Sequence, residues 1–177
     1  MTFGDVLAYL AFILATASTL WAAILTIGLV FSKKVAHAAG LLEHTPGKTI
    51  GLGVVLALLG IGLGLVLLNS KNGLGMLIGW VFLAITLFVA LIGSAGLALV
   101  LSGRMQRLAP TQSALAMLAR GGALLIGAGM LPGVGWILLF PLQLFSSLGA
   151  GIQALTARER RAYEQPVVQT QAQTTPQ

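Results

Sequence analysis

Charged side chains are scarce in this sequence. They make up 8% of its 177 residues, against roughly 25% in a soluble domain. Hydrophobic residues reach 57%, and the mean hydropathy is +0.96. This composition excludes a soluble globular domain of ordinary size and predicts a protein embedded in a membrane.

Cysteine is absent, which excludes disulfides, thiolate metal sites and cysteine catalysis. Acidic residues number four and histidines two, and no Asp, Glu, Lys or His falls within any predicted span. Transport coupled to protons or ions usually relies on ionisable groups inside the membrane. We therefore expect no coupled transport, and no catalytic, metal-binding or cofactor-binding residues.

Long stretches without any charged residue make up most of the sequence. They cover residues 6–31, 49–70, 72–103 and 121–157. About 20 helical residues cross a hydrocarbon core of ~30 Å, so each stretch is long enough to span a bilayer. The 23 glycines are compatible with packed transmembrane helices. The sequence thus predicts an all-α integral membrane protein.

We predict five transmembrane helices within one membrane domain over residues 1–161. The spans are expected at residues 6–31, 49–68, 75–101, 113–131 and 136–155, with a cytoplasmic linker at 32–48. The turn formers at 69–73 predict that the second and third spans make an antiparallel hairpin. Residues 162–177 have almost no apolar content and are predicted to form a disordered polar tail.

The first apolar run is predicted to be a retained span whose N-terminus lies outside. It is 26 residues long, and the basic pair Lys33 and Lys34 follows it. A secretory signal has its basic residues first and a shorter apolar stretch. In the linker, Val35, Ala38 and Leu42 recur at helical spacing among charged residues, which predicts a short amphipathic helix at the cytoplasmic surface.

The last two spans are predicted to form a hairpin. A single helix over residues 121–155 would be about 52 Å long, too long for one crossing. Pro132, Gly133 and Gly135 interrupt it and make the turn. Arg120 would cost ~2.5 kcal/mol or more at the membrane centre, so we place it near the cytoplasmic interface. The pattern leaves open whether this hairpin crosses fully or is shallow and re-entrant.

The basic residues fix the orientation, with the N-terminus out and the C-terminus in. Alternation of five spans puts nine of ten Lys and Arg residues in the cytoplasm and only Lys71 outside, as the positive-inside rule requires. This predicts a multi-pass protein of the cell inner membrane. We expect its formal net charge of +6 to reflect binding to anionic lipid headgroups and not to nucleic acid. The nine residues are Lys33, Lys34, Lys48, Arg104, Arg107, Arg120, Arg158, Arg160 and Arg161.

Small residues recur four positions apart, which is typical of faces where transmembrane helices approach closely. The glycines expected to pack in this way are Gly60, Gly64, Gly75, Gly79, Gly129 and Gly133, and the same spacing relates Ser147 to Gly151. Packing within one chain is the simplest expectation. A protein partner or a homo-oligomer is left open.

Two motifs resemble functional sites, a phosphate-binding loop and a metal site, but are explained more simply without them. The segment 45–49 resembles the end of a phosphate-binding loop, but position 42 is leucine where that loop needs glycine. His37 and His44 are seven residues apart, unlike the usual spacing of a helical metal pair, so we expect interfacial histidines. Trp80 and Trp136 are expected near the membrane surface, and Trp21 is expected to be packed.

Several short patterns resemble the multi-spanning region of bacterial bactofilin-like, polymer-forming cytoskeletal proteins. They are the run 30–35, the segment 46–49 leading into Gly51, the pair Gly103-Arg104 and the hairpin 131–136. The resemblance covers roughly Thr19 to Leu155. In that family a β-helical domain precedes the first span, which agrees with an outside N-terminus. These 177 residues show no such domain, so polymerisation is not carried over, and the resemblance implies a membrane module.

From the sequence we expect a non-enzymatic anchor, scaffold or accessory subunit of a membrane complex. The alternative is a small channel or transporter for an uncharged or weakly polar solute. It would be lined by glycine backbone and by hydroxyl groups such as those of Ser146 and Ser147.

Overall fold

The computed structural model describes residues 3–106, 113–131 and 133–157, and this part of the chain is helical apart from short turns. The predicted tail at 162–177 lies outside it, as do Arg107, Pro132 and the arginines of 158–161. Each predicted span corresponds to one helical segment. The helices are α1 (Phe3–Val30), α2 (Ser32–His44), α3 (Pro46–Leu68), α4 (Gly73–Gln106), α5 (Ala114–Met130), the π-helical turn η1 (Gly135–Leu139) and α6 (Phe140–Thr156).

Four described helical segments are long and apolar enough to cross a membrane. They are Phe3–Val30, Pro46–Leu68, Gly73–Met105 and Gly135–Thr156, the last formed by η1 and α6 together. The fifth predicted span coincides with α5, whose 17 residues rise only about 25 Å. The fold is therefore that of an all-α membrane protein with four full-length candidate spans and one shorter apolar helix.

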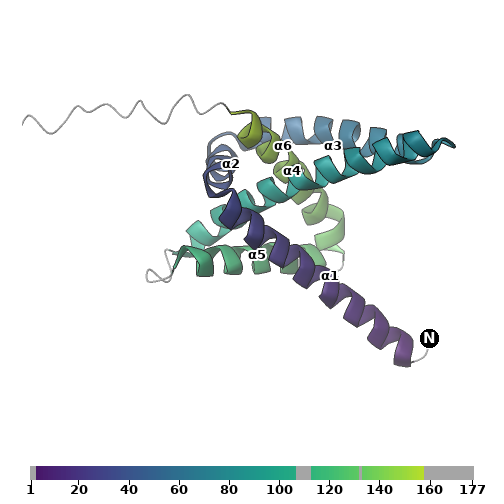
Figure 1. Ribbon diagram of the computed structural model, residues 1–177. Coiled ribbons are helices and arrows are strands. Elements are labelled where there is room, and N and C mark those ends of the chain that lie inside the picture. Colours follow the sequence, from purple (N-terminus) through teal and green to yellow (C-terminus); the bar gives the residue numbers. More distant parts are fainter. Residues whose placement is uncertain (1–2, 107–112, 132, 158–177) are drawn as a thin grey trace, which may run out of the picture.

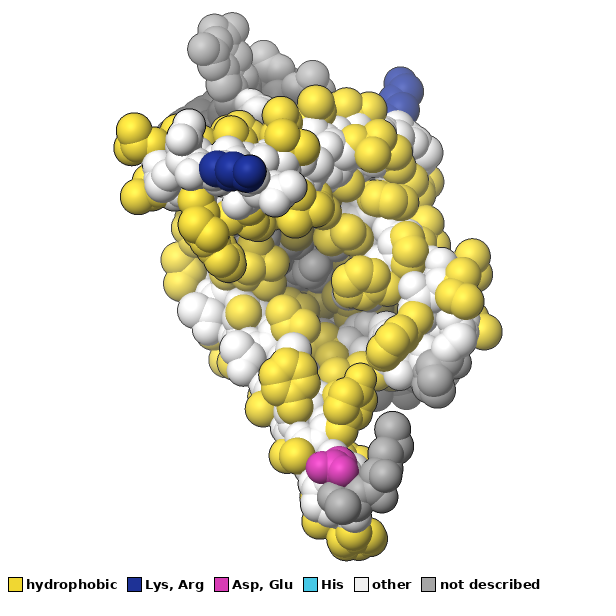
Figure 2. Space-filling view, turned by 90° about the vertical axis from the view of Figure 1, so that its right-hand side faces the viewer, with side chains coloured by type: hydrophobic (Ala, Val, Ile, Leu, Met, Phe, Trp, Pro, Cys, Tyr) yellow, Lys and Arg dark blue, Asp and Glu magenta, His cyan; other side chains and the backbone are white. Residues whose placement is uncertain are grey.

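The helices do not form a parallel bundle. α3 and α4 make a long antiparallel hairpin, α6 crosses it, and α5 lies against the C-terminal part of α1, whose N-terminal part projects away (Figure 1). Seen from the right-hand side of that view, the surface is mostly hydrophobic, and it is hollowed between the α3–α4 end and α1 (Figure 2). Such a surface suits contact with lipid or with another apolar surface.

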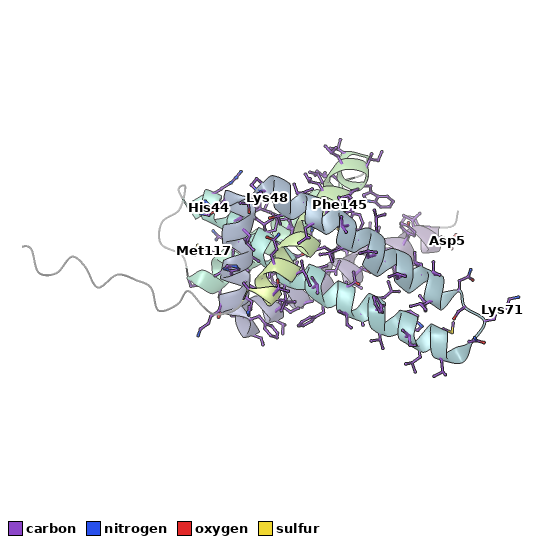
Figure 3. All side chains as sticks on the ribbon, turned by 90° about the horizontal axis from the view of Figure 1, so that it is seen from above. Asp5, His44, Lys48, Lys71, Met117 and Phe145 are labelled. Atoms are coloured by element: carbon purple, nitrogen blue, oxygen red, sulfur yellow. The ribbon has the colours of Figure 1, made fainter. Side chains whose placement is uncertain are left out.

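Charged residues lie at two opposite ends of the molecule. His44 and Lys48 lie at one end, and Asp5 and the turn residue Lys71 lie at the other (Figure 3). The bodies of the helices between them are apolar. The predicted alternation of spans requires this separation.

One face of α2 is buried against other helices, so α2 does not simply lie on the surface. It carries the predicted amphipathic pattern, but its apolar residues Val35 and Ala38 are both 0% exposed, because this face packs on α4 and α6. Ala38 lies against Gly96 of α4 and beside Ala150 and Ala154 of α6. The hydrophobic face is thus satisfied by protein and not by lipid.

The predicted hairpin turn falls between α5 and η1. Gly133 has a φ of 84°, a left-handed conformation that favours glycine. Gly135 is buried, and a Cβ there would meet the carbonyl oxygens of Ala128 and Gly129 in α5. At the other end of α5, the Ser113 hydroxyl caps the helix by accepting a 3.3 Å hydrogen bond from the Ala116 amide.

Candidate functional site at the crossing of α3, α4 and α6

The most buried part of the described structure is helix α6 between Ser146 and Ala154. Three different faces of this helix are covered by three neighbours, α2, α3 and α4. The face with Ala150 and Ala154 packs against α2, and small residues line the other two faces. A helix that is enclosed on three sides needs small residues on more than one face.

Glycine contacts join α6 to α3. A Cβ built on Gly149 would overlap the carbonyl oxygen of Thr49, and one built on Gly53 would overlap the carbonyl oxygen of Phe145. Both neighbouring atoms belong to helical backbone and cannot swing aside as a flexible side chain would. The two helices therefore meet backbone to backbone.

A second set of glycine contacts joins α6 to α4. A Cβ on Gly93 would overlap the carbonyl oxygen of Ser147, and a Cβ on Gly151 would overlap that of Val89. α4 approaches α5 in the same way, because a Cβ on Gly121 would overlap the carbonyl oxygen of Ala98. The predicted small-residue pair Ser147 and Gly151 thus lies on the face of α6 that contacts α4.

Buried and half-buried polar side chains lie at the same crossing and bond within the protein. The Ser94 hydroxyl donates to the Ser147 hydroxyl at 3.0 Å, linking α4 to α6. The Gln153 amide donates to the Thr49 hydroxyl at 3.5 Å, which links α6 to α3, and to the Gly149 carbonyl within α6 at 3.1 Å. Interhelical bonds of this kind contribute about 0.6 kcal/mol each on average.

Other hydroxyl groups at the crossing bond to the backbone four residues earlier. The Ser146 hydroxyl donates to the Leu142 carbonyl at 2.6 Å, and the Thr49 hydroxyl donates to the Thr45 carbonyl at 2.9 Å. Among the described side chains, no buried nitrogen or oxygen atom lacks a hydrogen-bond partner. The crossing is therefore a satisfied packing site, in which the hydroxyl groups of Ser94, Ser147 and Thr49 take part in bonds between helices and that of Ser146 is occupied within α6.

The predicted packing glycines lie mostly along the α3–α4 hairpin. Gly60 faces Thr86, and Gly64 faces Gly79 and Leu83 across the hairpin. Gly75 meets Ser70 within the turn. Near the predicted second turn, the side chain of Gln143 lies 3.6 Å from a Cβ built on Gly129, and Gly133 has open space around it; α5 and α6 otherwise make little contact with each other.

Of the predicted headgroup residues that are described, Lys33, Lys34, Lys48 and Arg104 lie near helix ends, whereas Arg120 lies within α5, as the seventh of its 17 residues. Lys33, Lys48, Arg104 and Arg120 are exposed. Lys34 is half-buried, and its ammonium donates a 3.2 Å hydrogen bond to the carbonyl of Ala157, which caps the C-terminus of α6. Lys34 thus ties α2 to the end of α6.

The tryptophans differ in their surroundings. Trp80 and Trp136 are exposed by 62% and 64%, whereas the Trp21 indole donates a 2.8 Å hydrogen bond to the Ala119 carbonyl of α5. Trp21 is itself 38% exposed, so it is anchored to α5 by this bond but is only partly packed. His37 and His44 are both exposed, and no group of three His, Cys, Asp or Glu residues that could hold a metal occurs in the described residues.

Sequence reasoning missed the glycines that matter most at the crossing. Gly53, Gly93 and Gly149 each touch backbone of another helix, but none was singled out. The available signal is the run of small residues along 146–151 of α6, interrupted only by Leu148, because consecutive helical positions point in different directions and such a run places small residues on several faces.

Comparison with known protein families, with curated proteins and with solved structures finds no match for this chain. The resemblance to bactofilin-like membrane regions therefore stays a prediction, and the arguments about function rest on the residues themselves.

Proposed function

We propose that this protein is a non-enzymatic anchor, scaffold or accessory subunit of a membrane complex. The satisfied crossing of α3, α4 and α6 is the observation that supports this most. Ser94, Ser147, Thr49 and Gln153 bond to each other or to helix backbone, and glycines bring the backbones together. These polar groups serve a rigid packed unit, which is what an anchor requires.

The proposal includes a place and an orientation. We place the chain in a bacterial inner membrane, with the N-terminus and Lys71 outside and the exposed Lys33, Lys48 and Arg104 at anionic headgroups inside. The exposed apolar length of α1, where Phe3 is 84% and Phe12 70% exposed, then offers area to lipid or to a partner helix.

The proposal predicts a fixed partner and no solute flux. When the tagged chain is extracted into native-lipid nanodiscs, we expect another membrane protein to accompany it in constant ratio, and the tagged partner to retrieve this chain in return. In liposomes, the purified chain should not accelerate glycerol entry above protein-free vesicles, measured by stopped-flow light scattering.

The rival function, a channel for uncharged solutes, makes the opposite prediction. Glycerol flux that depends on protein would support it, especially if Ser147→Ala changes the rate while Ser18→Ala does not. Ser18 is a matched control because its hydroxyl bonds only to its own helix at the exposed surface. Flux of this kind together with a lone chain in nanodiscs would overturn the scaffold proposal.

A further inference from the structure

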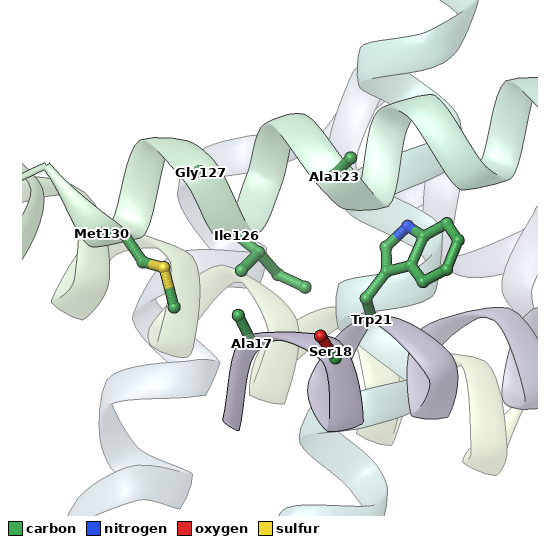
Figure 4. Close-up of a pocket in the computed structure, with 7 residues that line it drawn as sticks. All are labelled: Ala17, Ser18, Trp21, Ala123, Ile126, Gly127 and Met130. Carbon is green, nitrogen blue, oxygen red and sulfur yellow. The ribbon is translucent and has the colours of Figure 1, made fainter. Parts of the chain in front are cut away.

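An apolar cleft lies between α1 and α5. Its volume is about 280 Å³, close to the lower end of ligand pockets, which begin at ~300 Å³. The Trp21 indole stands at one end of the cleft and Met130 at the other, while Ile126 lies between them (Figure 4). The lining residues are Ala17, Ser18, Trp21, Ala123, Ile126, Gly127 and Met130.

Arg120 is not one of the lining residues, but it lies one turn of α5 before the first of them on that helix. Arg120 precedes Ala123 by three residues and Gly127 by seven, so it lies on the same side of α5 as these two lining residues. It is exposed, and none of the described residues forms a hydrogen bond or ion pair with it. The guanidinium is therefore available to an anion from outside the protein.

The direction of α5 sets the guanidinium toward the basic end of the molecule. Side chains of a helix tilt toward its N-terminus, and Met117 in the first turn of α5 lies at the same end of the molecule as His44 and Lys48 (Figure 3). A long arginine side chain extends further toward the headgroups by snorkelling. The cleft runs from Arg120 in the opposite direction, toward Met130 and the membrane interior.

We propose that this cleft binds one anionic phospholipid, with its phosphate on Arg120 and one acyl chain between α1 and α5. The site goes beyond the proposed function and depends only on the chain crossing a membrane. Charge complementarity selects the anionic headgroup. The lining extends over eight residues of α5 from Ala123 to Met130, a rise of about 10 Å, which suits an extended alkyl segment and is too small for a helix about 10 Å wide.

Tryptophan quenching tests the proposal. The variant with Trp80→Phe and Trp136→Phe keeps only Trp21, at the end of the cleft, as a reporter. It is reconstituted into two vesicle preparations with the same content of phosphatidylglycerol and phosphatidylcholine. In one preparation the brominated acyl chains belong to phosphatidylglycerol, and in the other they belong to phosphatidylcholine, at the same mole fraction of brominated lipid. One arginine at an anionic surface favours binding about fivefold, so brominated phosphatidylglycerol should quench Trp21 several-fold more.

Two further variants separate this site from general lipid enrichment. Arg120→Gln should make the two labels quench equally. Gly127→Leu should also make the two labels quench equally, although Arg120 keeps its charge. No atom lies within 4 Å of a Cβ built on Gly127, so the leucine side chain fits there and fills the cleft. Lys71→Gln, at the opposite end of the molecule, should retain the preference.

The outcomes that overturn the site are distinct. Equal quenching by both labels before any change at Arg120 would show that no anionic lipid is selected. A preference that survives Gly127→Leu would assign the effect to bulk enrichment around a basic protein. Absence of quenching by either label would show that protein, such as a second copy of the chain, covers the cleft.

Discussion

Gly149→Leu is expected to abolish the compact fold, which should appear as aggregation after extraction into mild detergent. A Cβ at Gly149 already overlaps the Thr49 carbonyl and approaches the Gly53 amide to 3.0 Å. These are backbone atoms of α3, so the helices must separate and their interhelical hydrogen bonds must break. Overpacking of a tight core costs about 1–3 kcal/mol or more, and a leucine at a backbone contact should exceed that range.

The matched control for Gly149→Leu is Gly62→Leu. Gly62 also lies in a predicted span, and no atom lies within 4 Å of a Cβ built on it. Size-exclusion profiles and the midpoint of unfolding in SDS should remain those of the unmodified protein for Gly62→Leu. If the two substitutions behave alike, α6 is not held against α3 in the way described.

Ala38→Leu should lower the free energy of unfolding by about 1–3 kcal/mol. Ala38 is fully buried, against Gly96 of α4 and two alanines of α6. Three extra carbon atoms have no space there. The change would be read from the unfolding midpoint in SDS by circular dichroism.

A neighbouring residue on α2 provides the comparison for this second substitution. Ala36 lies on the exposed side, and Ala36→Leu should leave the midpoint within the experimental error. If α2 instead lay on the lipid surface as a free amphipathic helix, Ala38→Leu would add apolar contact and would be neutral or stabilising. That result would contradict the packing of α2 against α4 and α6.

Much of the fold can be predicted from where charge is missing. The runs 6–31, 49–68 and 75–101 correspond to α1, α3 and α4, because a chain without charge over 20 residues satisfies its backbone most simply as a membrane helix. Pro132 and its neighbouring glycines mark the break between α5 and η1. α5 itself is shorter than a typical span, and its sequence shows this only through Arg120 within the apolar run.

The packing could not be predicted in the same way, for a physical reason. Lipid is as apolar as a protein interior, so hydropathy does not distinguish a side chain that faces lipid from one that faces a helix. The apolar pattern around Val35 and Ala38 is equally compatible with a bilayer surface and with a protein core. Small residues are a better signal, yet Gly62 and Gly149 look alike in the sequence, and only the second touches a neighbouring backbone.

The lack of cysteine makes one measurement especially direct. Single Lys48→Cys and Lys71→Cys variants, both at exposed positions, would be treated with a membrane-impermeant maleimide in right-side-out and in inverted membrane vesicles. We expect labelling of the Lys71→Cys variant in right-side-out vesicles and of the Lys48→Cys variant in inverted ones. Labelling of both variants from the same side would contradict it, because α3 would then not cross the membrane.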